Sequence, residues 1–189
     1  HSFPTRRSSD LIGLSQRTTA GGIERFAENI LKESSFQKIL VFDIPKSRAF
    51  MHLDTVFTMV DYDKFTIHPE IEGPLQIYEI TLSGDGKAHF ESIQGELEDI
   101  LSSELKLPAV ELIRCGGDDP MAAQREQWND GSNTLAIAPA TVITYERNYV
   151  TNDLLEKKGI KVITMPSSEL SRGRGGPRCM SCPVNRDDL

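Results

Sequence analysis

The sequence predicts an α/β fold built from about two and a half ββαβ units. Short runs of apolar and β-branched residues, typical of strands, alternate with longer stretches whose apolar residues recur at helical spacing. Turn signals rich in Gly, Pro, Asp and Asn separate these stretches. In chain order they give a helix and a strand, then two copies of strand–strand–helix–strand. The copies share no obvious sequence identity, which indicates a structural repeat.

The N-terminal half supplies the first helix and most of the first full unit. Residues 12–20 look like the end of a strand and a polar turn, and Thr18 or Thr19 can cap the helix expected at residues 21–33. The strands expected after this helix cover residues 38–44, 49–60 and 74–82.

The C-terminal half repeats the pattern. Helices are expected at residues 92–105, 121–128 and 149–158, with Gly159 placed as the stop of the last one. Strands are expected at residues 109–115, 134–138, 141–146 and 161–165.

Composition narrows the classes of function. The 189 residues carry a net charge of −7, which argues against binding to nucleic acid or to an acidic membrane through bulk charge. No apolar run has the length of a membrane span. Three cysteines are an odd number and too few for a disulfide scaffold, so a reducing compartment is expected, with the protein in the cytoplasm.

Residues 1–11, HSFPTRRSSDL, do not fit the pattern of the chain that follows. They have no apolar core of a signal peptide, and they match a translation of common sequencing-adapter DNA in one reading frame. We therefore expect residues 1–11 to be an unstructured artefact, and residues 12–189 to be the C-terminal part of one catalytic domain. A ββαβ unit leaves strand edges uncovered, which also favours a chain that continues upstream.

Two polar residues stand out in the apolar run at residues 49–60. His52 and Asp54 are two residues apart, so on the expected strand both side chains point to one face. Histidine and aspartate on a largely apolar face are costly to bury without a purpose. The alternative is a hydrogen-bonded pair that serves only the core.

A glycine- and arginine-rich stretch, SRGRGGPRCMSCP at residues 171–183, presents Cys179. A thiolate needs positive neighbours or a helix terminus to form near neutral pH, and Arg174, Arg178 or a cationic substrate can supply the charge. Cys179 with His52 would then form a nucleophile and an acid/base pair. The alternative is a floppy C-terminal loop with an incidental cysteine.

Metal and nucleotide sites have weaker signals. Cys179 and Cys182 spell C-x-x-C, but no further pair of Cys or His stands at metal-ligand spacing, and Cys115 fits a small core residue. GGDDP at residues 116–120 and NDGSN at residues 129–133 fit turns. No P-loop or Rossmann pattern occurs in the sequence.

Longer stretches together resemble the bacterial arginine deiminases, of the guanidine-modifying superfamily. The matching stretches are IGLSQRTT, MHLDTVFT, FTIHPEI, GGDDPMAAQREQWNDGSNTLAIAP, YERNYVTNDLLEKKGI and GRGGPRCMSCP. The resemblance implies a partial five-bladed α/β (pentein) propeller, of which each ββαβ unit is a blade.

The resemblance also implies a reaction and a set of roles. The full-length enzyme would hydrolyse the guanidinium group of L-arginine to L-citrulline and ammonia through a covalent cysteine intermediate, with no cofactor and with a homo-oligomer left open. The implied roles are nucleophile for Cys179, general acid/base for His52, guanidinium binding for Asp54, substrate-carboxylate binding for Arg17, substrate contact through the backbone carbonyl for Gly173, and a mobile neighbour for Arg174.

The family's other guanidinium-binding carboxylates lie upstream of Ile12, so we expect this chain alone to be inactive. The alternatives are an amidinotransferase, a deiminase of another guanidine, or a non-catalytic zinc or thiol module.

Overall fold

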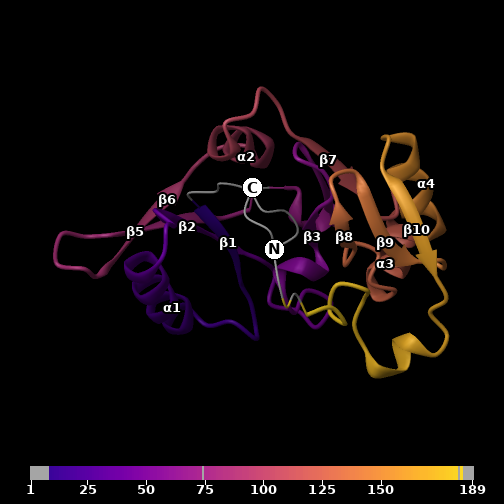
Figure 1. Cartoon of the computed structure of the whole chain (residues 1–189), viewed down its shortest axis with the longest axis horizontal. Coiled ribbons are helices and arrows are strands. Elements are labelled where there is room, and N and C mark those ends of the chain that lie inside the picture. Colours follow the sequence, from indigo (N-terminus) through magenta and orange to yellow (C-terminus); the bar gives the residue numbers. More distant parts are fainter. Residues whose placement is uncertain (1–8, 74, 183, 185–189) are drawn as a thin grey trace. The chain divides into compact units, whose positions relative to one another are not determined.

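The computed structural model describes residues 9–73, 75–182 and 184, and the chain divides into two compact units (Figure 1). Of the described residues, unit 1 contains residues 54–72 and those from 109 onward. Unit 2 contains residues 9–53, 73 and 75–108. Among the described residues, each unit is therefore built from two separate segments of the chain.

Unit 2 is a four-stranded mixed sheet with two helices. The sheet has the strand order β1-β2-β5-β6, in which β1 and β2 are parallel and the other neighbours antiparallel. Its elements are β1 (Ser9–Leu14), α1 (Ala20–Glu33), β2 (Lys38–Asp43), β5 (Ile77–Leu82), β6 (Ala88–Ile93) and α2 (Leu97–Leu105).

Helix α1 forms where the sequence predicts it. The Thr19 side chain accepts a hydrogen bond from the Gly22 N–H at 3.3 Å and caps the first turn. Ile23, Ala27 and Leu31, four residues apart, form the buried face of the helix. This face packs in one apolar cluster with residues of β2 and β5, so α1 covers one face of the sheet.

Unit 1 contains two three-stranded sheets with the same topology. In both, the first two strands are antiparallel and the third is parallel to the second: β3-β4-β7 and β8-β9-β10. The strands are β3 (Phe57–Met59), β4 (Lys64–Ile67), β7 (Glu111–Arg114), β8 (Leu135–Ala138), β9 (Thr141–Tyr145) and β10 (Lys161–Met165). The helices are α3 (Pro120–Trp128) and α4 (Tyr149–Lys157).

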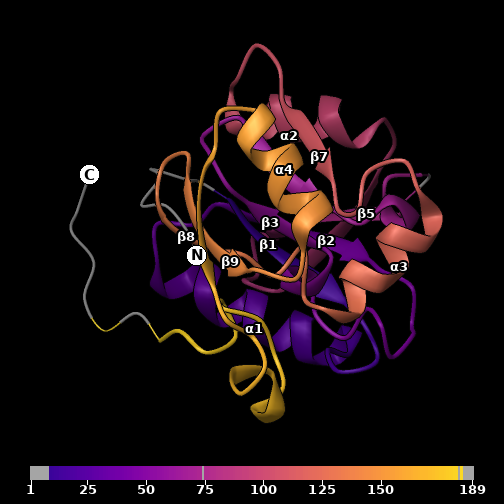
Figure 2. The same ribbon diagram turned by 90° about the vertical axis from the view of Figure 1, so that its right-hand side faces the viewer.

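Helix α4 connects the parallel strands β9 and β10 and lies against their sheet (Figure 2). Val142 of β9 and Leu155 of α4 are completely buried. Gly159 follows the helix with a φ of +81°, the left-handed conformation that ends helices, as predicted. This last ββαβ unit confirms the pattern predicted from the sequence.

The preceding unit differs from the prediction. Its strands β3, β4 and β7 share a sheet, but the chain between β4 and β7 forms β5, β6 and α2, which belong to unit 2. Strands β4 and β6 were not predicted, and the helix expected at residues 92–105 starts only at Leu97. The α/β class with mixed sheets is confirmed, and closure into a propeller stays a prediction.

The single strand predicted at residues 49–60 is wrong. Only Phe57–Met59 form a strand, because only these residues find a partner, on β4. Leu53–Thr55 form a 3₁₀ turn instead. The β-branched and aromatic residues that suggested one strand are buried by the fold around this turn, without continuous strand pairing.

The N-terminal segment also differs from the expectation. Ser9–Leu11, expected to be unstructured, form the first half of β1 and pair with Lys38–Leu40. Residues 1–8 lie outside the described residues. No helix in the described part of the chain is long and apolar enough to span a membrane.

Candidate active site

The loop that carries Cys179 follows a short 3₁₀ turn at Leu170–Gly173, and residues 171–182 are called the cysteine loop here. Its predicted end, Pro183, lies outside the described residues. Hydrogen bonds to Tyr145 and Asn133 attach the loop to the rest of unit 1. The Tyr145 hydroxyl donates to the Gly175 carbonyl at 2.9 Å, and the Cys179 N–H donates to Asn133 Oδ1 at 3.2 Å. The loop is therefore anchored at Gly175 and at Cys179 itself.

Glycine is required at two positions of the cysteine loop. Gly175 has a φ of +97°, and a Cβ on it would lie 2.7 Å from Cys179 Cβ. A Cβ on Gly176 would lie 2.5 Å from Asn133 Oδ1. Gly173 has open space around it. The glycines nearest the thiol thus allow close backbone packing.

Asp54 lies beside this loop, in the 3₁₀ turn that replaces the predicted strand. Its backbone carbonyl accepts from the Asn133 amide at 3.0 Å. Its carboxylate Oδ2 pairs with Arg178 Nη1 at 3.3 Å, and both side chains are about one-quarter exposed. The other oxygen, Oδ1, is buried and has no hydrogen-bond partner among the described residues. Cys179 and Asp54 are thus brought together.

The electrostatic surroundings of the Cys179 thiol differ from the expectation. Desolvation raises its pKa, the Gly176 backbone and the Asn133 side chain lower it, and the charges of Asp54 and Asp130 raise it further. The Cys179 residue as a whole is exposed, although its thiol is partly desolvated. Neither Arg174 nor Arg178 is among the groups that lower this pKa, and Arg178 pairs with Asp54. The help expected from a cationic substrate stays a prediction.

A second carboxylate, Asp130, belongs to the same region. Burial raises its pKa, the Arg147 cation lowers it, and Asp54 raises it. Arg147 lies over the Tyr145 ring, with its guanidinium carbon 5.5 Å from the ring centroid. Asp130 thus adds a second negative charge that acts on the thiol.

Arg17 and His52 belong to unit 2, where their segments contact each other. The Ser15 hydroxyl donates to the Met51 carbonyl at 2.7 Å, and the Arg17 N–H donates back to this hydroxyl at 3.1 Å. Both Arg17 and His52 are exposed residues. Because residues 53–55 form a 3₁₀ turn, the prediction that His52 and Asp54 share one face of a strand is wrong.

Gly173 and Arg174 stand at the start of the cysteine loop, and both are exposed. Arg174 has a φ of +63°, and its N–H donates to the Ser171 carbonyl at 3.0 Å. The left-handed backbone at Arg174 marks the change from the 3₁₀ turn to the loop. The substrate contacts expected of both residues stay predictions.

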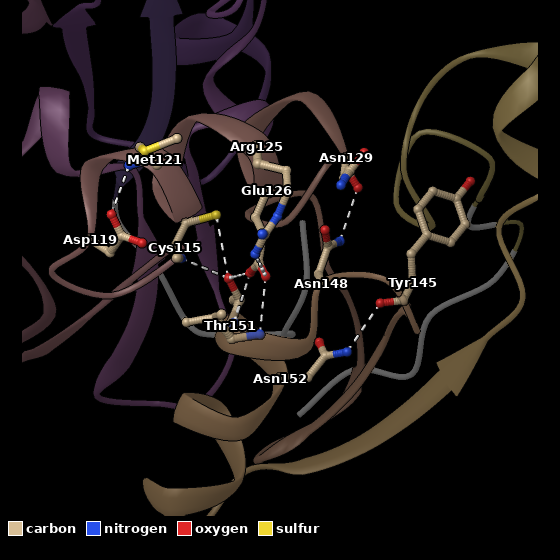
Figure 3. A network of polar contacts seen from close by, with 12 residues as sticks. Cys115, Asp119, Met121, Arg125, Glu126, Asn129, Tyr145, Asn148, Thr151 and Asn152 are labelled. Carbon is tan, nitrogen blue, oxygen red and sulfur yellow. Dashed lines mark hydrogen bonds and ion pairs between the residues drawn. The ribbon is translucent and has the colours of Figure 1, made fainter.

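A buried polar network supports the turn at residues 129–133 (Figure 3). The completely buried Glu126 accepts from the Thr151 N–H at 2.9 Å and from its hydroxyl at 2.6 Å. The Glu126 carbonyl accepts from the Gly131 N–H at 2.7 Å, and the Asn148 side chain donates to the Asn129 carbonyl at 2.9 Å. The turn is thus fixed to α3 and to the start of α4.

The cysteines do not assemble into a larger cluster. All three are free, and Cys115 is a completely buried core residue, as predicted. Its sulfur lies 3.5 Å from the Thr151 hydroxyl oxygen. Burial raises the pKa of the Cys115 thiol to about 11. Among the described residues, no group of three or more Cys, His, Asp or Glu side chains is arranged to hold a metal ion.

Sequence reasoning missed the roles of Asn133, Asp130 and Tyr145. The first two lie in NDGSN, where the residue types indicate a turn, and they do form one. The local pattern carries no sign that an amide in this turn reaches Cys179, 46 residues later in the chain. Tyr145 belongs to a predicted strand, and nothing in the sequence indicates that its hydroxyl bonds to the cysteine loop.

Comparison with known proteins gives the family. The family model for arginine deiminase matches residues 3–186. An arginine deiminase of Streptococcus agalactiae serotype V is 59% identical over 179 residues, which cover 94% of this chain and 43% of the relative. One of Clostridium perfringens is 58% identical over 182 residues, 94% of this chain and 44% of the relative. The chain thus spans less than half the length of these curated relatives.

Solved structures share the fold at low sequence identity. An amidinotransferase of saxitoxin biosynthesis from Microseira wollei has a TM-score of 0.60 at 19% identity, covering 94% of this chain and 44% of that one. The N-terminal domain of a cyanobacterial arginine dihydrolase has a TM-score of 0.59 at 14% identity, covering 95% and 52%. Because the arginine deiminase family model matches almost the whole length of this chain, the chain belongs to the arginine deiminase family.

Proposed function

We propose that the full-length protein containing this chain hydrolyses L-arginine to L-citrulline and ammonia, with Cys179 as the nucleophile. The observation that carries the proposal is the contact between the Asp54 carboxylate and the Arg178 guanidinium, next to Cys179 in the chain. A carboxylate that holds one guanidinium group beside the cysteine loop has the chemistry to hold that of free arginine. The family membership supports the same substrate.

The substrate cation also explains the charge of the site. Desolvation raises the pKa of the Cys179 thiol, and the charges of Asp54 and Asp130 raise it further, so the thiolate is disfavoured while Arg178 occupies Asp54. A bound guanidinium closer to the sulfur than Arg178 favours the thiolate. The nucleophile is thus activated mainly when substrate is present. Arg17, an exposed cation, is the proposed partner of the substrate carboxylate.

The proposed reaction has two steps. The Cys179 thiolate attacks the guanidinium carbon to give a tetrahedral adduct, and the carbon–nitrogen bond breaks as His52 protonates the leaving ammonia. An S-alkylthiouronium remains on Cys179. Water, deprotonated by His52, then attacks the same carbon, and the carbon–sulfur bond breaks to release citrulline and the thiolate.

The proposal extends to the architecture. The two sheets of identical topology in unit 1 are proposed as neighbouring blades of a five-bladed propeller whose remaining blades lie upstream, with residues 12–189 as the C-terminal part of that catalytic domain. The 189-residue chain alone is then inactive, because upstream guanidinium-binding carboxylates are needed. The cytoplasmic location, a homo-oligomeric full-length protein and the adapter origin of residues 1–11 remain predictions.

A fusion protein tests the function. The upstream part of the Streptococcus agalactiae relative is joined to residues 12–189 of this chain, and citrulline and ammonia are measured with L-arginine. We expect turnover by the fusion and none by the 189-residue chain. Cys179→Ala and His52→Ala in the fusion should each abolish turnover, whereas the exposed-site control Gln124→Ala should not. Unchanged turnover in the Cys179→Ala variant would show that Cys179 is not the nucleophile.

The same fusion separates the alternatives. Transfer of the amidino group from arginine to an added amine such as glycine, with ornithine as the other product, would indicate an amidinotransferase. Release of ammonia from agmatine but not from arginine would indicate another deiminase. Stoichiometric zinc in the purified 189-residue chain, lost in Cys179→Ser and Cys182→Ser, would favour a zinc module.

A further inference from the structure

Asn133 connects the two segments that carry the proposed nucleophile and guanidinium-binding carboxylate. Its side chain is completely buried, and both of its polar atoms are used. Nδ2 donates to the Asp54 carbonyl at 3.0 Å, and Oδ1 accepts from the Cys179 N–H at 3.2 Å. One amide group thus bonds to the backbone of both residues.

We propose that Asn133 is a positioning residue, which holds Cys179 and Asp54 at the separation that the reaction needs. The proposal rests on the function proposed above, and it adds a residue to which the sequence analysis gave no role. Asn133 acts through the backbone of its two partners and contributes no proton to the reaction.

The chemistry of the contact requires an amide. One partner atom is an N–H and needs an acceptor, and the other is a carbonyl oxygen and needs a donor. A neutral amide supplies both at a fixed spacing, while a carboxylate supplies only acceptors. The amide also contributes to lowering the pKa of the Cys179 thiol, against the desolvation that raises it.

The packing around Asn133 agrees with this role. Gly176 lies so close that a Cβ there would be 2.5 Å from Oδ1 and 2.8 Å from the Asn133 Cβ. Such spacing is below ordinary van der Waals contact, so the loop backbone rests directly on the amide. The cysteine loop therefore has its position set by this side chain.

The backbone of Asn133 is itself held in place by hydrogen bonds. Its N–H donates to the Asp130 carbonyl at 3.0 Å, and the neighbouring Gly131 N–H donates to the Glu126 carbonyl at 2.7 Å. Helix α3 ends at Trp128, just before this turn. A buried side chain on an anchored turn loses little further entropy when it bonds, so it can hold its partners within a narrow range.

Hydrogen exchange on the full 189-residue chain tests the anchoring without any turnover. In Asn133→Ala, exchange at the Cys179 amide should rise about tenfold or more, the effect of losing one buried hydrogen bond and its partner's pairing. Exchange in α1 of unit 2 should stay unchanged, which separates local release from global unfolding. The control Gln124→Ala, on the exposed side of α3, should alter neither region.

Kinetics of the fusion protein test the positioning. Asn133→Ala should lower kcat about a hundredfold, the usual cost of a misplaced reacting group, while KM for arginine changes less than about threefold. The split is expected because the Asp54 carbonyl keeps its bond from the Thr58 hydroxyl at 3.2 Å, so Asp54 still binds substrate, while the Cys179 N–H loses its partner.

Asn133→Asp gives a signature that simple loss of packing does not. As a carboxylate, the introduced group repels the Asp54 carbonyl. Once protonated, it again offers one donor and one acceptor. Burial and nearby Asp54 raise the pKa of this carboxyl, so the ratio of variant to native kcat should recover as pH falls through the mildly acidic range.

The outcomes separate this inference from the proposed function. If the fusion does not turn over arginine but Asn133→Ala still accelerates exchange at the Cys179 amide, Asn133 anchors the loop and the proposed function is rejected. The proposed positioning role in catalysis is then rejected with it. An active fusion whose Asn133→Ala form keeps native kcat, or whose Asn133→Asp form shows no acid-side recovery, would overturn the positioning role.

Discussion

Glu126 is expected to be the most important polar side chain for the order of helix α4. It is completely buried and accepts hydrogen bonds from the Val150 N–H at 3.0 Å and from Thr151 through both its N–H and its hydroxyl, at 2.9 and 2.6 Å. The helix has no side-chain bond from its own N-cap residue, Asn148. Glu126 therefore caps α4 from a different helix.

The size of the effect follows from these contacts. Hydrogen bonds to a charged group each contribute about 1.5–3 kcal/mol, and a negative charge at a helix N-terminus is favoured in addition. The bonds are not independent, so we expect Glu126→Ala to lower the free energy of opening of α4 by about 3 kcal/mol. That is roughly a hundredfold faster amide exchange. Glu126→Gln keeps one acceptor and should accelerate exchange about tenfold.

Hydrogen exchange of peptides that cover residues 149–158, in the full chain, measures the effect directly. The matched control is Glu156→Gln, an exposed glutamate on the same helix, which should change exchange by less than about twofold. Protection in α1 serves as the internal reference for folding. An increase below about threefold in Glu126→Ala would refute the reasoning that this carboxylate caps the helix.

Three further results are expected. Gly176→Ala should release the cysteine loop and increase its exchange, whereas Gly173→Ala, which has open space around it, should have little effect; equal effects would contradict the packing. Cys115 has a pKa of about 11, so at pH 8 it holds about a thousandfold less thiolate than thiol. Iodoacetamide should therefore label the exposed Cys182 first. Labelling of Cys115 should become faster only as the pH rises towards 11 or when the protein unfolds. Tyr145→Phe should loosen the loop about fivefold by exchange, one neutral hydrogen bond, and native-like exchange would show that this hydroxyl is dispensable.

Elements whose signals are local were predictable from the sequence. Helix α1 has a capping threonine and one apolar face, and α4 has a glycine stop, so both were expected close to their actual ends. Pro139 marked the turn between β8 and β9. The predicted strand at residues 49–60 failed because strand propensity acts only where a neighbouring strand is present, and β4 reaches only three of these residues.

The reactive residues of the candidate site were predictable from the sequence, but the residues that hold them in place were not. The cysteine loop and Asp54 carry residue types that indicate chemistry, and the structure brings them together. The direction of the Cys179 pKa shift was not predictable, because it depends first on how far the fold desolvates the thiol and then on Asp54 and Asp130, which are distant in the sequence. Asn133 has the same local signature as any turn asparagine, and only its distant partners distinguish it.

The alternation of the chain between the two units has a consequence for biosynthesis and for proteolysis. Strand β4 of unit 1 must wait for β7, because the residues between Gly73 and Pro108 build unit 2, and β2 of unit 2 must likewise wait for β5. Neither unit can therefore be completed on the ribosome before the other has begun, and early strands are exposed longer than in a chain of consecutive domains. A single protease cut anywhere between Asp54 and Pro108 would interrupt the covalent continuity of both units at once.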